Sequence, residues 1–289
     1  MYSAVCTLEH DQLSACAVEC DESTLYTAGR DGIIRVWDLD EGDCLLEWGG
    51  YTRRIETLAA PVAGQLLSAG DGGDISQWDS KTGERLAVHR GHTDIVTDLD
   101  GDANGATMVS VSYDRTVRRW KLGEHSGPVE TVLTDRKLVT VSLSPDFAVV
   151  AYGGVGPTVE VWTLDSDATQ VELGTHEDAV VSTEFTANGT QLVTIDHGGR
   201  IRWWERDAWE VIATHELTET GDYPLAVSSE LVAVGTDQGI SLFDTDGDLR
   251  SELDLDVGVA ALAIGRGGSP LVAGTYDGRA IVYHDRDSH

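Results

Sequence analysis

The sequence is poor in lysine, in proline and in long hydrophobic runs. It contains three lysines against seventeen arginines, and only six prolines in 289 residues. No apolar run reaches the roughly 18 residues that a membrane-spanning helix needs, so no transmembrane segment is predicted. The first residues carry neither a basic segment nor a long apolar one, which argues against a signal peptide and predicts a cytoplasmic location.

The cysteines and histidines form no recognisable chemical motif. The four cysteines, Cys6, Cys16, Cys20 and Cys44, make no C-x-x-C pair, and no histidine follows them at zinc-finger spacing. No G-x-S-x-G elbow, H-E-x-x-H motif, phosphate-binding loop or dinucleotide fingerprint occurs. We therefore expect no metal, no cofactor and no enzymatic activity.

Charge of one sign dominates. The chain has 50 acidic and 20 basic residues, a net charge of −30. General binding to nucleic acid requires a basic surface that releases counterions, so the charge balance argues against this function class and no nucleic-acid partner is expected.

Aromatic residues recur along the chain with a period of about 40 residues. We call them the anchors: Trp37, Trp78, Trp120, Trp162, Trp204, Phe243 and Tyr283. An apolar residue stands twelve positions before each: Leu25, Leu66, Met108, Val150, Leu192, Leu231 and Leu271. A repeat of 40–45 residues is typical of β-propeller blades, each a four-stranded sheet.

Each copy has the pattern of short strands joined by tight turns. In the first, residues 25–28 are apolar, 29–32 are turn-forming and 33–37 alternate between apolar and other side chains. Other copies add a strand before this pair, such as 180–185, and one after it, such as 85–88. The prediction is an all-β, seven-bladed propeller with four antiparallel strands in each blade.

These residues resemble the WD-repeat (WD40) propeller family over essentially the whole chain. The likeness rests on Gly91-His92 placed 28 residues before Trp120, and on Trp37-Asp38 and Trp78-Asp79. It implies a structural hydrogen-bonded tetrad formed by His92, Ser112, Asp114 and Trp120. In blades two, four and five, Gly72, Gly156 and Gly198 replace the aspartate, so we expect these blades to be less firmly braced.

The N-terminal segment has the pattern of a further strand. We expect residues 2–8 to complete the last blade, formed by about residues 257–289, and so to close the ring, because closure removes exposed sheet edges. The chain is then one domain, residues 1–289, and is expected to be monomeric on its own.

The resemblance predicts a non-catalytic platform that docks a protein or an acidic peptide on the top face of the ring. Candidate partner-binding residues are Arg30, Arg53, Arg54, Tyr113, Arg115, Arg136, Lys137 and Tyr276. The alternative is a propeller enzyme or small-ligand binder that uses the central channel. Metal-dependent hydrolysis there would need converging carboxylates and histidines, and inner-strand acids such as Asp98 and Glu184 look too sparse to supply them. A channel lined by three or more carboxylates or histidines would favour this alternative, and one filled by apolar side chains would favour the platform.

The surplus of aspartate and the shortage of lysine resemble proteins of salt-accumulating haloarchaea, which stay soluble through a large negative charge. An acidic scaffold from a eukaryote or a bacterium is the competing interpretation.

Overall fold

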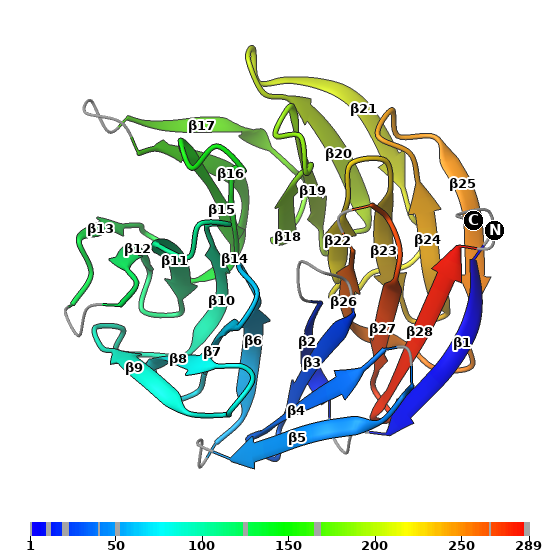
Figure 1. Ribbon diagram of the computed structural model, residues 1–289. Helices are drawn as coiled ribbons and strands as arrows, with labels where there is room; N and C mark the ends of the chain where they lie inside the picture. Colours follow the sequence, from blue (N-terminus) through cyan, green and yellow to red (C-terminus); the bar gives the residue numbers. More distant parts are fainter. Residues whose placement is uncertain are drawn as a thin grey trace.

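The chain forms a ring of small β-sheets. The computed structural model describes residues 2–9, 13–18, 23–39, 41–49, 53–123, 127–164, 169–265 and 267–285. These residues contain 28 strands in seven four-stranded antiparallel sheets, the blades, around a central axis (Figure 1). No helix within the described ranges is long and apolar enough to cross a membrane. The predicted seven-bladed propeller is confirmed.

Within blades 1 to 6 the strands pair in the order of the sequence, from the inner strand at the channel to the outer strand at the rim. Blade 1 contains β2 (Leu13–Val18), β3 (Thr24–Gly29), β4 (Ile33–Asp38) and β5 (Cys44–Gly49). Blade 2 contains β6 (Ile55–Ala59), β7 (Gln65–Gly70), β8 (Ile75–Asp79) and β9 (Arg85–His89). Blade 3 contains β10 (Val96–Gly101), β11 (Thr107–Ser112), β12 (Thr116–Lys121) and β13 (Glu130–Leu133).

The remaining blades follow the same scheme. Blade 4 contains β14 (Leu138–Leu143), β15 (Val149–Gly154), β16 (Gly156–Thr163) and β17 (Gln170–Thr175). Blade 5 contains β18 (Val180–Phe185), β19 (Gln191–Asp196), β20 (Arg200–Glu205) and β21 (Glu210–Glu216). Blade 6 contains β22 (Leu225–Val227), β23 (Val232–Thr236), β24 (Gly239–Phe243) and β25 (Leu249–Asp254). Blade 7 contains β26 (Val259–Ile264), β27 (Leu271–Thr275), β28 (Arg279–Asp285) and β1 (Tyr2–Glu9).

Blade 7 is completed by the N-terminal strand, as predicted. β1 runs antiparallel to β28, with register from Tyr2 opposite Asp285 to Glu9 opposite Arg279 (Figure 1). Leu8 of β1 is buried in a hydrophobic cluster with Trp37 of blade 1. The strand thus contributes both backbone pairing and core packing to the closure of the ring.

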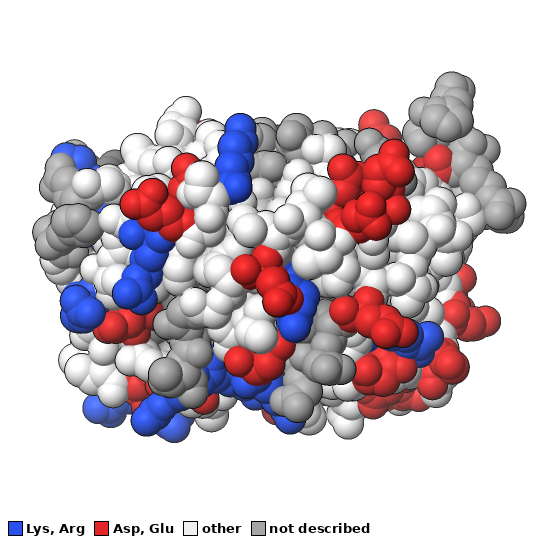
Figure 2. Space-filling model, turned by 60° about the horizontal axis from the view of Figure 1, so that its bottom comes forward, with Lys and Arg blue, Asp and Glu red and all other residues white. Residues whose placement is uncertain are grey.

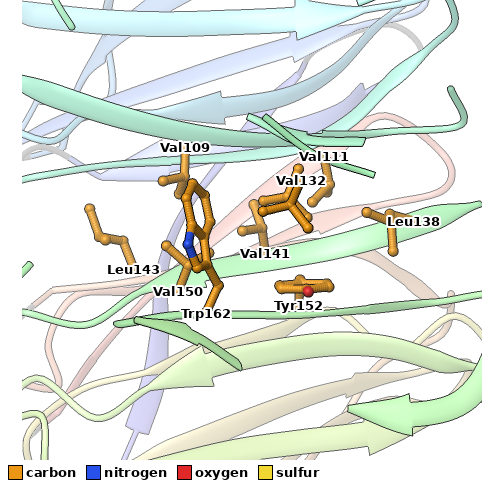
Figure 3. Packing of buried hydrophobic residues seen from close by; sticks show 10 residues of the cluster. Val109, Val111, Val132, Leu138, Val141, Leu143, Val150, Tyr152 and Trp162 are labelled. Carbon is orange, nitrogen blue, oxygen red and sulfur yellow. The ribbon is translucent and has the colours of Figure 1, made fainter. Parts of the chain in front are cut away.

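The core lies between blades, where each anchor packs against the preceding blade. Trp162 of blade 4 packs with Val109 of blade 3, and the same cluster contains Leu143, Val150 and Tyr152 (Figure 3). The residue twelve positions earlier lies directly opposite the anchor in six blades, as for Val150 and Trp162. In blade 6 Val232 faces Phe243 instead of the predicted Leu231, because the turn between β23 and β24 is shorter.

The tetrad of blade 3 uses Ser110, so the prediction of Ser112 was wrong. The Trp120 indole Nε1 donates to Ser110 Oγ at 2.8 Å, and His92 Nε2 lies 2.7 Å from the same oxygen. His92 Nδ1 lies 2.9 Å from Asp114 Oδ2, as expected. Met108 is opposite Trp120, so a side chain two residues further along the same face reaches the indole, whereas Ser112, four residues along, lies too far away.

Blade 5 is also fully braced, contrary to expectation. Trp204 Nε1 donates to Thr194 Oγ1 at 2.8 Å. His176 Nε2 lies 2.8 Å from the same hydroxyl oxygen, and His176 Nδ1 lies 3.1 Å from Asp196 Oδ2. Gly198 does replace the expected aspartate, but Asp196, two residues earlier, supplies the carboxylate in its place. Blade 2 keeps the indole bond, from Trp78 to Ser68 at 2.7 Å.

We expect Ser110→Ala to lower the free energy of unfolding by about 1–3 kcal/mol, because it removes the shared partner of two buried polar groups. Thr194→Val should have a similar effect in blade 5, since it removes only a hydroxyl. Ser251→Ala, at an exposed site on β25, is the control and should change stability by less than about 0.5 kcal/mol. Urea unfolding measures all three, and a Ser110→Ala value equal to that of the control would contradict the corrected tetrad.

The role of β1 can be tested with two substitutions in the same strand. Leu8 is 3% exposed and Val5 is 55% exposed. Leu8→Ala should cost about 2–5 kcal/mol through the cavity that it leaves at the blade 7–blade 1 interface. Val5→Ala should be nearly neutral, within about 0.5 kcal/mol. Equal melting temperatures for the two variants would show that β1 contributes no packing to closure.

Candidate functional site

All eight predicted partner-binding residues lie on one face of the ring. Turns between the second and third strands of a blade emerge on the same side as loops that lead to the next inner strand, because neighbouring strands are antiparallel. We call this side the top face. It carries the predicted Arg30, Arg53, Arg54, Tyr113, Arg115, Arg136, Lys137 and Tyr276. They come from blades 7, 1, 2, 3 and 4, and form an arc around the channel mouth.

Two of these cations are engaged by carboxylates. Arg136 lies 3.1 Å from Glu160 and 3.2 Å from Asp135, and its side chain is largely covered. Arg54 lies 2.8 Å from Glu56. Because these guanidinium groups are already paired, they contribute to the top face mainly as structural ion pairs.

Tyr113 and Lys137 form a contact between blades 3 and 4. The Lys137 ammonium lies 4.5 Å from the centre of the Tyr113 ring, a cation–π geometry. The pair presents an aromatic surface together with a positive charge at the exposed side of the interface.

Arg30, Arg53 and Arg115 are exposed and form no salt bridge with any residue that the structure describes. Tyr276, which is 56% exposed, lies between charges of opposite sign. Burial raises its pKa; the nearby Asp222 and Asp237 add to this rise, and Arg54 and Arg30 oppose it. The basic arc therefore meets acidic residues of blade 6 at Tyr276.

The central channel is a cavity of about 430 Å³ lined by the inner strands. Its wall carries five carboxylates, those of Glu56, Asp98, Asp100, Glu184 and Asp222, and no described lining residue is basic. The wall thus meets the condition of three or more carboxylates that favours a channel role, although these acids do not converge on one point in the described part of the chain. Such acids lie far apart in the sequence, and only the ring brings their strands together.

Side chains of one inner strand bind the backbone of the next. Asp98 Oδ2 accepts from Val141 N at 2.9 Å, and Asp100 Oδ2 accepts from Leu143 N at 2.8 Å, which joins blade 3 to blade 4. One blade further, Thr140 Oγ1 accepts from Thr183 N at 3.0 Å, and Ser142 Oγ accepts from Phe185 N, also at 3.0 Å. In all four bonds the donor lies 43 residues after the acceptor. We call this series the inner belt.

Burial makes the channel acids hard to ionise. It raises the pKa of Asp98 to about 7, although Val141 N, Leu99 N and the Thr57 hydroxyl donate to its carboxylate. It raises the pKa of Asp100 to about 6. The pKa of Glu184 rises well above its usual range through burial and through the charges of Asp100 and Asp98.

No group of three or more His, Cys, Asp or Glu side chains in the described part of the chain has the arrangement of a metal site. The channel acids are thus distributed around the wall rather than gathered at one point.

Comparison with known proteins identifies the repeat. Residues 3–38 and 83–121 match the family model "WD domain, G-beta repeat". The protein is a WD40-type β-propeller. Each match extends from the outer strand of one blade through the third strand of the next, so the WD40 repeat is displaced by one strand from the structural blade. The first match accordingly begins in β1, the outer strand of blade 7.

Several curated proteins resemble parts of this WD40-type propeller. Autophagy-related protein 16 of Arabidopsis thaliana is 27% identical over 61% of the chain and 35% of its own length. WD repeat-containing protein 90 of Xenopus tropicalis is 25% identical over 90% of the chain and 15% of its own length. Target of rapamycin complex subunit wat1 of Schizosaccharomyces pombe is 25% identical over 56% of the chain and 54% of its own length. The chain thus spans only about half or less of each of these relatives.

The channel acids predict that the propeller loses stability as the pH rises above about 6.5. Asp98 has a pKa of about 7 when folded against an ordinary value of 3.8, so the folded state binds the extra proton between these values. Its stabilising contribution is complete below pH 3.8 and is lost as the pH rises through about 7. His92 and His176, whose pKa values burial lowers, act in the opposite direction, but only below their ordinary value of 6.5.

Unfolding free energies between pH 6.5 and 8.5 test this prediction. Asp98→Asn should lower stability overall but reduce its decline with pH, because the titrating group is gone. Thr140→Val is the matched control, since it breaks an equivalent bond of the inner belt without removing a titratable group. A decline that is equally steep in both variants would show that Asp98 does not cause it.

Proposed function

We propose that this protein is a non-catalytic interaction platform that holds a protein partner on its top face. The observation that carries the proposal is the presence of three exposed arginines, Arg30, Arg53 and Arg115, that form no salt bridge with any described residue. In a chain with 50 acidic residues, exposed cations at one rim that make no salt bridge within the described ranges favour a ligand that supplies negative charge.

The partner's chemistry follows from these side chains. Guanidinium groups bind carboxylates in a two-pronged geometry, and exposed tyrosines supply rigid contact area with a polar tip. An acidic peptide segment that crosses the mouth near Arg30, Arg53 and Tyr276 fits both features. A closed ring also holds its loops in place before binding, which reduces the entropy lost on association.

The names of the relatives support a role of this general kind. Wat1 is named as a subunit of the target of rapamycin complex, and membership of a complex requires surfaces that hold other proteins. We place the protein in the cytoplasm, and the net charge of −30 is suited to an interior of high salt concentration.

A second candidate function is a small-ligand binder that uses the central channel. The observation in its favour is the acidic lining described above, with five carboxylates around a cavity of about 430 Å³. This role is compatible with docking on the top face, because the two sites use different residues.

Affinity capture with the purified protein, followed by mass spectrometry and binding to each purified candidate partner, tests the docking role. Arg53→Glu combined with Arg115→Glu should lower the affinity for the confirmed partner at least roughly tenfold, because it reverses the charge at two contacts. Lys81→Glu combined with Arg85→Glu makes the same charge change on the opposite face and should leave binding intact. Equal affinities for the two double variants, with melting temperatures unchanged, would locate docking elsewhere.

A further inference from the structure

Glu184 interrupts the inner belt. It lies 84 residues after Asp100 and 42 after Ser142, which are the equivalent positions of β10 and β14, and both of those side chains accept a backbone N–H from the next inner strand. The equivalent donor for Glu184 would be Val227 N on β22. No hydrogen bond joins these groups, and no described residue donates to the Glu184 carboxylate.

The sequence of blade 6 explains the interruption. β22 has only three residues, Leu225–Val227, and follows Pro224, whereas β10, β14 and β18 have six each. The neighbouring Ser182 binds a carbonyl, that of Tyr223, at 2.7 Å. The Glu184 carboxylate therefore stays on the channel wall as an acceptor that the fold itself does not use.

Three carboxyl groups act on one another across this wall. The charges of Asp98 and Asp100 both disfavour ionisation of Glu184, and no cation of the described lining offsets them. Neighbouring carboxylates repel one another, which makes their joint ionisation costly, and a partly exposed acceptor that no described group serves has only water or a ligand to bind. A positively charged hydrogen-bond donor in the channel would offset the repulsion and fill the acceptor.

The arrangement of the described acids does not suit a small ion. The described acids do not converge closely enough to coordinate a metal ion, while the cavity of about 430 Å³ has room for a group of several heavy atoms. Its walls are otherwise formed by threonine, serine and apolar side chains such as Ala261 and Leu262, which suit the carbon chain of an organic amine.

We propose that the central channel binds an organic cation, an ammonium or guanidinium group, whose N–H donors contact Glu184 and lie beside Asp98 and Asp100. The inference names the ligand class of the channel role proposed above and does not depend on the docking face. The cation belongs either to a free polyamine or to a lysine or arginine side chain that a partner inserts into the channel.

Isothermal titration of the purified protein at fixed ionic strength tests the proposal with two probes. One is spermidine, and the other is an acetylated, amidated Gly-Arg-Gly tripeptide. One-to-one binding of either probe is expected. Binding of spermidine alone would indicate that the natural ligand is a free polyamine, and binding of the tripeptide alone would indicate a partner side chain. Binding of both would indicate that the channel recognises the charged group itself.

Glu184→Gln separates channel binding from attraction to the acidic surface. This variant loses no hydrogen bond and only one of the chain's 50 acidic residues, so non-specific binding should persist, whereas channel binding should weaken roughly tenfold or more. Glu172→Gln, at an exposed site on β17, is the matched control and should bind like the wild type. Failure of both probes to bind, or equal affinity in the two variants, would overturn the proposal.

Proton release provides a second readout. A bound cation favours the ionised form of Glu184, so binding near neutral pH should expel a proton and the affinity should rise between pH 6.5 and 8.5. The binding enthalpy should then vary with the ionisation enthalpy of the buffer. This experiment needs no partner protein, so its failure leaves the docking role standing, and failure of docking leaves the channel site standing.

Discussion

The third-strand aromatic residue of each blade is buried against the preceding blade, so no blade has a complete core until the ring closes. Trp162 packs on Val109 across one such interface, and Trp37 packs with residues of blade 7 across another. The last interface requires β1, which brings Leu8 into the same cluster as Trp37. The positions of the top-face loops and of the channel wall follow from closure, because both are fixed by strands that cannot move without opening an interface.

The sequence predicted the fold well because a propeller repeats its packing. The residue that faces the anchor occupies an equivalent position in each blade, so the sequence shows each packing position seven times. The predictions that were wrong concern residues whose contacts depend on strand register. The sequence shows that Ser110 and Ser112 point to the same face, but only the pairing of Met108 with Trp120 determines which hydroxyl the indole reaches. Asp196 was missed for a similar reason, since it reaches His176 from a position two residues before the expected one.

The candidate site was predicted only in part. The topology of antiparallel blades places the eight predicted residues on one face, which could be inferred from turn positions alone. Whether an arginine on this face is free to bind a partner could not be inferred, because carboxylates that pair with it, such as Glu160 for Arg136, come from a different strand. The channel acids were undervalued because Asp98 and Glu184 are 86 residues apart in the chain. Their interaction exists only once two inner strands of different blades face the same cavity.

The large negative charge determines how both candidate sites can operate. On the side of the molecule that Figure 2 shows, groups of acidic side chains lie with basic ones beside and between them. At low ionic strength the field of the whole molecule would oppose an acidic partner and attract any cation, irrespective of the site. At molar salt the Debye length falls to about 3 Å, so this long-range field disappears. Selectivity then depends on contacts from which water is excluded, where an unpaired arginine or an unpartnered carboxylate such as Glu184 retains its strength. High salt therefore does not abolish recognition by such residues, but removes the non-specific attraction and repulsion that would otherwise mask it.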